Sequence, residues 1–141
     1  MDFALGLTPL GKVYKIGSNI AGVVRGVGKS AGKYDVGAYN SIKNTVSGMD
    51  AHHVGQQAVM KKLVSGYDAG IAPSILVPKV GHTIKGPRGI VSRGTKGFNN
   101  ARQVVARDIR ELRRVYPDVP NSQLRQLINL NKQMYPSAMS K

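Results

Sequence analysis

The residues best suited to chemistry are three histidines, the only ones among 141 residues. His52 and His53 are adjacent and follow Asp50, whereas His82 closes a second apolar run at residues 74–82. In an extended strand alternate side chains share a face, so Asp50 and His52 are expected on one side and His53 on the other. Where such a strand ends and twists, both rings can reach one cleft. His52 could then bind a divalent cation, His53 could take a proton from water, and His82 could complete the metal site.

Phosphodiester hydrolysis requires this pair of functions, because a cation stabilises charge on the phosphate and a base with a near-neutral pKa activates water. Adjacent histidines also occur by chance on surfaces, and a single histidine is usually structural, so the spacing alone leaves both interpretations open. Other catalytic classes fit less well. No serine lies in a nucleophile elbow, and the single glutamate, Glu111, lies in a basic segment, which disfavours paired carboxylates. The chain has no cysteine, so only nitrogen and oxygen atoms can bind a metal.

The charge of the chain favours a polyanionic partner. Lys and Arg number 21 against 7 Asp and Glu, a formal net charge of +14. Between residues 79 and 114, ten Lys and Arg stand against two acidic residues, a net +8. Such a block can neutralise a phosphate backbone whatever its base sequence, although a solvated basic surface is the alternative interpretation. The side chains expected to bind nucleic acid are Lys85, Arg88, Arg93, Lys96 and Arg102.

Hydrophobic spacing predicts helices around a small β element, which is an α+β fold. The expected strands are residues 34–42 with a turn, 49–54, and 74–80, where Pro78 favours an edge position or a bulge. The expected helices are residues 7–28, 56–64, 100–116 capped by Asn99 or Asn100, and a last one capped by Asn121 or Ser122 and ending before Pro136. Residues 85–97 are expected to form a loop that orders only against a partner. No apolar run approaches the roughly 18 residues of a membrane span.

The histidine segments resemble a known family of nucleases. Residues 50–53 (Asp-Ala-His-His), followed by Val-Gly-Gln, resemble the AHH and SHH variants of the HNH/endonuclease VII, or His-Me finger, superfamily, which occur as C-terminal toxin domains of bacterial polymorphic toxins. The same order is similar to the motif of colicin-type DNases. Residues 75–82 resemble the second strand and helix start of HNH nucleases, and residues 37–39 resemble the lead-in of these toxin domains. The resemblance covers roughly residues 34–116.

The resemblance implies a small ββα-metal core surrounded by helices, with residues 1–33 as a helical lead-in and 34–141 as the nuclease toxin domain. By position, His52 and His82 would bind the metal and His53 would act as general base, with Asp50 as an occasional ligand or a partner of one. The metal would be a divalent ion, with Mg²⁺ favoured over Zn²⁺, Mn²⁺ or Ni²⁺. The asparagine that orients the base in many members has no clear match, since Ser74 lies near that position. A second helical histidine is also absent, which leaves four amides as substitutes: Gln56, Gln57, Asn99 and Asn100.

The expected function is therefore that of a metal-dependent endonuclease toxin acting on competing bacteria. DNA is favoured over RNA, because a base acting on water beside a cation needs no 2′-hydroxyl group. Such a toxin would be secreted or delivered by its producer, would act in the cytoplasm of the target cell, and would have an acidic cognate immunity protein. The alternatives are a basic nucleic-acid-binding module without activity, an RNA-cleaving toxin, and a membrane-active toxin built on residues 7–28.

Overall fold

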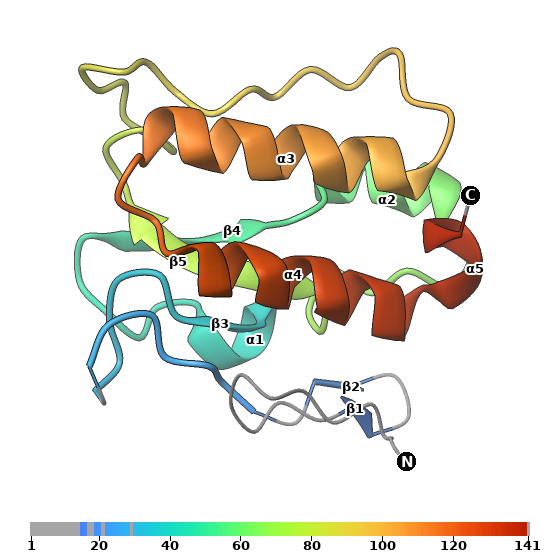
Figure 1. Ribbon diagram of the computed structural model, residues 1–141, viewed down its shortest axis with the longest axis horizontal. Helices are drawn as coiled ribbons and strands as arrows, with labels where there is room; N and C mark the ends of the chain where they lie inside the picture. Colours follow the sequence, from blue (N-terminus) through green and yellow to red (C-terminus); the bar gives the residue numbers. More distant parts are fainter. Residues whose placement is uncertain (1–14, 17–18, 21, 29, 141) are drawn as a thin grey trace.

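The computed structural model describes residues 15–16, 19–20, 22–28 and 30–140, and helices cover a small sheet in it (Figure 1). The sheet is antiparallel and contains β3 (Val36–Ala38), β4 (Met49–His53) and β5 (Pro73–Pro78), in the order β3-β5-β4. The helices are α1 (Tyr39–Ile42), α2 (Gln57–Leu63), α3 (Ala101–Val115), α4 (Asn121–Met134) and α5 (Pro136–Met139). The expected α+β class is confirmed.

The strand β5 lies in the centre of the sheet, so the edge position expected from Pro78 is wrong. Its middle residues Ile75, Leu76 and Val77 are fully buried, as a strand covered on both faces requires. Pro73 and Pro78 stand at the two ends of the strand, and the missing N–H groups therefore interrupt no ladder in its middle. Both prolines still accept hydrogen bonds through their carbonyl groups, from the Val54 amide and the Tyr116 hydroxyl.

The two long helices lie side by side in front of the sheet, with α4 packed on β5 and β3 and with α3 also touching α2 and α5 (Figure 1). Their apolar faces bury Leu112, Leu127 and Leu130 almost completely. The expected cap of α3 is confirmed, since the Asn100 side chain accepts a hydrogen bond from the amide of Gln103. The expected cap of α4 is wrong, because Pro120 occupies the cap position of that helix. No helix in the described part of the chain is long and apolar enough to cross a bilayer.

The helix expected at residues 7–28 is not formed by the described residues of that range. Residues 15–16 (β1) and 19–20 (β2) pair as two short antiparallel strands, and residues 22–28 contain no helix. The remaining residues of that range lie outside the described part. The glycines explain the failure, because each costs a helix interior about 1 kcal/mol relative to alanine. Val24 instead pairs with Val36 beside the sheet. The division of the chain at residue 33 stays a prediction.

The chain after β5 forms a turn and then a long loop without helix until α3. The amides of residues 82–84 all bond to the carbonyl group of Lys79, and Gly81 has a left-handed φ of 97°, which an α-helix does not allow. The helix start expected at His82 is therefore wrong. Residues 85–97 form the expected loop but are ordered within the protein itself, because Val91 is buried and α3 side chains bond to the loop backbone.

The substitution Gly81→Ala is expected to lower the free energy of unfolding by about 3 kcal/mol. This cost is the sum of the strain of a left-handed conformation in alanine and of overpacking by the added Cβ atom. A Cβ atom at this position would lie 2.6 Å from Cγ1 of Val115. Gly66→Ala is the matched control, since Gly66 has a φ of 71° but no atom of the described residues within 4 Å of the added one; it should cost only about 1 kcal/mol. Urea unfolding of both variants measures the difference, and equal losses would show that packing around Gly81 is loose.

Candidate active site

All three histidines line one cavity of about 320 Å³. The end of β4 supplies His52 and His53, and the turn after β5 supplies His82. Pairing of β4 with β5 places residue 49 opposite residue 78, so the turn that follows β5 begins beside the start of β4 and folds back along it. The ring centroids of His52 and His82 are consequently 4.9 Å apart. The expected convergence of the three rings on one cleft is thus present.

His53 is held as a neutral ring with a defined tautomer. Its Nε2 atom lies 2.9 Å from the carbonyl oxygen of Ala69, and because a carbonyl only accepts, Nε2 carries the proton and Nδ1 keeps its lone pair. The ring stacks on Tyr39, with centroids 4.3 Å apart and an interplanar angle of 15°. Burial lowers the pKa of His53 below its usual value, although the bond to Ala69 opposes this. His53 therefore has the state that a general base requires.

His52 has a buried nitrogen that no described residue partners. Its Nε2 atom makes no hydrogen bond to any described residue, although the side chain is only 9% exposed. Such an unpartnered group destabilises the folded state by about 1–3 kcal/mol, so its presence requires an explanation. Burial, together with the charges of the neighbouring rings of His82 and His53, lowers the pKa of His52 to about 3. A neutral imidazole with an unused lone pair is a typical metal ligand.

Asp50 orients His82 and lies outside the histidine cavity. Nδ1 of His82 donates to the Asp50 carboxylate at 2.8 Å, which leaves Nε2 of His82 with the lone pair. Lys79 and Thr83 also donate to the same carboxylate. Burial alone would raise the pKa of Asp50, but these three hydrogen bonds outweigh it and lower the pKa to about 2. Asp50 lines a neighbouring cavity of about 210 Å³ and acts here as a partner of a candidate ligand.

The candidate metal donors are two imidazole nitrogens. Among the described residues no group of three or more His, Cys, Asp or Glu side chains could hold a metal ion, and His53 uses its Nε2 atom to bond Ala69. The orphaned Nε2 of His52 and the Nε2 of His82 would be the two protein donors to a divalent ion, whose other ligands would be water and substrate oxygen. Imidazole donors suit Zn²⁺ or Ni²⁺ better than Mg²⁺, which prefers oxygen.

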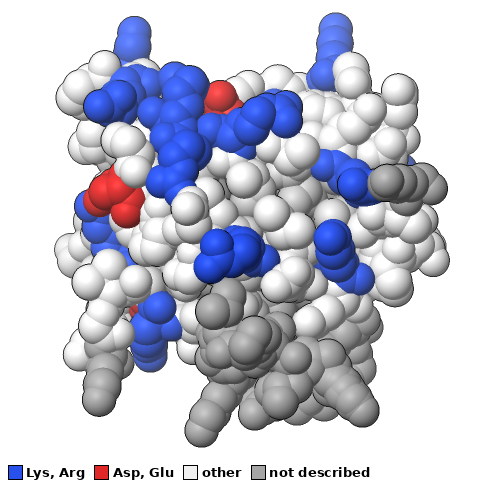
Figure 2. Space-filling view, viewed as in Figure 1, with Lys and Arg blue, Asp and Glu red and all other residues white. Residues whose placement is uncertain are grey.

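The expected nucleic-acid-binding side chains are divided between different surfaces. Arg93 lines the histidine cavity and donates a hydrogen bond to the carbonyl oxygen of His82. Arg88 lines a separate cavity of about 280 Å³ beside Tyr34 and Tyr116. Three others, namely Lys85, Lys96 and Arg102, line neither cavity. Figure 2 shows Lys and Arg gathered at the α3 side of the molecule, with smaller acidic patches beside them.

Two of the four side-chain amides that were expected to support the site line its cavity. Gln56 and Gln57 line the histidine cavity. At the start of α3, the side chain of Asn100 instead accepts a hydrogen bond from the amide of Gln103, and the backbone amide of Asn99 donates to the Gln103 side chain.

Sequence reasoning missed several residues of this cavity, among them Tyr39, Ser92 and Asp108. Tyr39 was part of the resemblance at residues 37–39, which assigns it no role in the site. Asp108 had a recognisable signal, since it lies four residues after Val104 and four before Leu112, on the apolar face of α3.

Comparison of the chain with protein-family models, with curated proteins and with solved structures finds no match. The functional assignment therefore depends on the residues of the site and on the resemblance of its histidine segments.

Proposed function

We propose that this chain is a metal-dependent endonuclease that hydrolyses phosphodiester bonds of DNA. The observation that carries the proposal is the cavity in which an oriented neutral His53, an orphaned nitrogen of His52 and the side chain of Arg93 meet. His82 contributes a second imidazole to the same cavity. A base, two metal donors and a cation are together the groups that phosphodiester hydrolysis needs.

In this proposal His53 removes a proton from the attacking water through Nδ1. The hydrogen bond from Nε2 to Ala69 and the stacking on Tyr39 fix the plane of the ring, so Nδ1 keeps one direction during the reaction. When bound by His52 and His82, the cation supplies charge stabilisation for the phosphate and the leaving oxygen. Arg93 binds a phosphate oxygen through the planar guanidinium group, which suits phosphate better than a lysine does.

The fold supports a comparison with the ββα-metal core. We propose that β4 and β5 are its two strands, because β4 ends on the histidine pair and β5 leads directly to His82. The turn at residues 79–84 then replaces the start of the helix, and α3 covers the cavity instead through Asp108.

The biological role that we propose is that of a toxin domain delivered by a bacterium into the cytoplasm of competing cells. The basic surface over α3 (Figure 2) supports an acidic immunity protein as the partner that protects the producer. DNA is the favoured substrate, since the proposed mechanism uses no 2′-hydroxyl group.

The test is digestion of supercoiled plasmid and of RNA side by side, with Zn²⁺, Ni²⁺, Mn²⁺ or Mg²⁺ present or with a chelator. We expect nicking of the plasmid that depends on the cation, with RNA cut more slowly. DNA that is bound but never cut with any of these metals would support a binding module instead. Expression in bacteria should also be lethal, and an inactive His53 variant should relieve it.

The pH dependence of cleavage should reveal the state of His53. A base acts only when neutral, and burial lowers the pKa of His53. Cleavage should therefore be lost only as the pH falls through this lowered pKa, so that the acid limb of kcat/KM lies below 6.5, the ordinary histidine value. Lys61 lowers this pKa through its charge, so Lys61→Gln should move the limb towards higher pH. An acid limb at or above 6.5 in the wild type contradicts the assignment.

A further inference from the structure

We propose that Arg107 is a positioning residue, which holds residues 92–94 on α3 so that the Arg93 side chain stays beside His82 at the cavity. This inference rests on the proposed function, because it assigns Arg93 a phosphate as substrate. Arg107 lies in a helix rich in arginine, where its charge alone suggests contact with nucleic acid. Its contacts instead lie within the protein.

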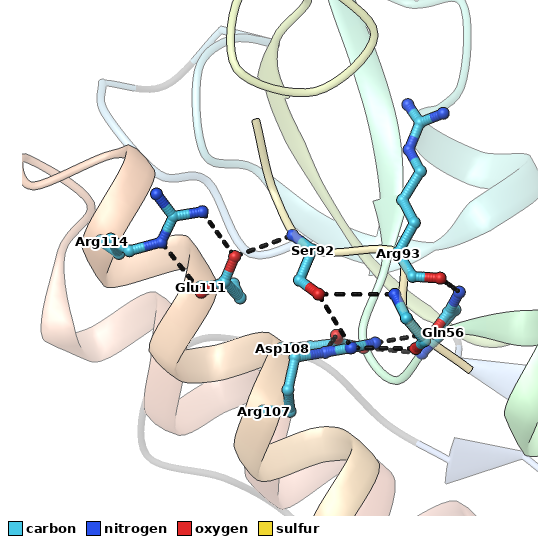
Figure 3. Close-up of polar contacts among 8 residues, drawn as sticks. Gln56, Ser92, Arg93, Arg107, Asp108, Glu111 and Arg114 are labelled. Carbon is cyan, nitrogen blue, oxygen red and sulfur yellow. Dashed lines mark hydrogen bonds and ion pairs between the residues drawn. The ribbon is translucent and has the colours of Figure 1, made fainter. Parts of the chain in front are cut away.

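The guanidinium group of Arg107 donates hydrogen bonds to the loop residues on both sides of Arg93. Its Nη1 atom donates to the Ser92 hydroxyl at 3.3 Å and to the Gly94 carbonyl at 3.0 Å. Between these two positions the carbonyl of Arg93 accepts a hydrogen bond of 3.1 Å from the Gln56 side chain. Three consecutive loop residues are thus held from one side (Figure 3).

Arg107 is itself held in one orientation. Its Nε atom donates to Asp108 at 2.7 Å, and Nη2 donates to the Gln56 side chain at 2.6 Å. The Phe98 ring lies under the guanidinium group, with 5.0 Å to its centroid. Asp108 is only 1% exposed, and its other oxygen accepts the amide of Gln56 at 2.7 Å. All three guanidinium nitrogens are therefore used, in a geometry that lysine cannot reproduce.

These contacts fix the backbone of Arg93, whereas its side chain is exposed. Figure 3 shows this side chain extending away from Arg107 and Gln56. Its Nη2 atom donates to the carbonyl of His82, and the residue lines the histidine cavity. A long side chain on a loop without secondary structure would otherwise sample many positions, and fixing its backbone beforehand reduces the entropy lost when it binds phosphate. Gln56, which follows soon after His53, belongs to the same hydrogen-bonded group as Arg107. The group therefore links the segment that carries His53 with the loop that carries Arg93.

The test in solution is a double-mutant cycle on DNA cleavage. Arg107→Gln should lower kcat/KM about 10–100-fold, mainly through kcat, because displacement of a reacting group by about 1 Å has an effect of this size. Arg93→Ala should cause a loss of similar size, and the double variant should be no worse than the worse single one. Arg125→Gln, which removes an exposed charge from α4, should leave the rate unchanged. A double variant whose loss equals the product of both single losses overturns the proposal.

A second measurement does not depend on nuclease activity. Trypsin should cut the Arg93–Gly94 bond about tenfold faster or more in Arg107→Gln than in the wild type or in Arg125→Gln, since two hydrogen bonds to the loop are lost. Arg107→Lys covers the case in which Arg107→Gln does not fold, because it keeps the charge beside Asp108 but cannot hold Ser92 and Gly94 together. Unchanged cleavage in the folded variants overturns the positioning role. A wild type without nuclease activity refutes the proposed function and leaves this measurement valid.

Discussion

Replacement of His53 by alanine is expected to lower the rate of DNA cleavage by about 10²–10⁴-fold, the usual contribution of general acid–base catalysis. The physical reason is that Nδ1 of His53 is the proposed acceptor of the water proton, with Nε2 already donating to Ala69. The affinity for DNA should hardly change, because the buried His53 carries no charge near neutral pH. Plasmid nicking measures the rate, and fluorescence anisotropy of a labelled duplex measures the affinity.

Two controls separate lost chemistry from lost structure. The His53→Ala variant should bind the metal as the wild type does, since His53 is not a proposed ligand. Added imidazole should restore part of the cleavage, because the variant leaves space between Tyr39 and Ala69 for a free ring. A variant that still cleaves within about twofold of the wild-type rate, far inside the range expected for loss of a base, would exclude His53 from this role.

Loss of the metal donors is the second large effect that we expect. A chelator should abolish cleavage, and His52→Leu or His82→Ala should weaken metal binding by more than about 100-fold. Of the two candidate ligands, Asp50 contacts His82, so Asp50→Asn should weaken metal binding by about 10–100-fold, as is typical for partners of ligands. Titration calorimetry with Zn²⁺ or Ni²⁺ measures all three affinities on the protein alone.

The choice of leucine at position 52 makes this test specific. His52 buries a nitrogen without a partner among the described residues, so a buried apolar side chain of similar size should leave the metal-free protein as stable as the wild type or more stable. Thermal unfolding with and without metal shows whether stability and binding change in opposite directions. Equal metal affinity in the wild type and in His52→Leu contradicts the proposed site.

The sequence alone predicted the elements whose signals are local. The spacing of apolar residues and the Asn100 cap were sufficient for α3, and the apolar run before His82 was sufficient for β5. The same kind of signal was wrong for residues 7–28, where apolar spacing suggested a helix although the glycines oppose one. Local patterns indicate what a segment can form by itself. A segment with a low intrinsic preference for helix takes its structure from the elements that it packs against. Val24 pairs with Val36 for this reason.

The identity of the three histidines was determined by the sequence, but their chemical states were decided only by the tertiary structure. The order of the strands, with β5 in the centre, depends on pairing between distant segments, which no local pattern contains. The lone pairs at Nδ1 of His53 and Nε2 of His82 depend on contacts with Ala69 and Asp50. A ring nitrogen becomes a base or a ligand according to what its other nitrogen bonds, and chain folding alone brings those partners together.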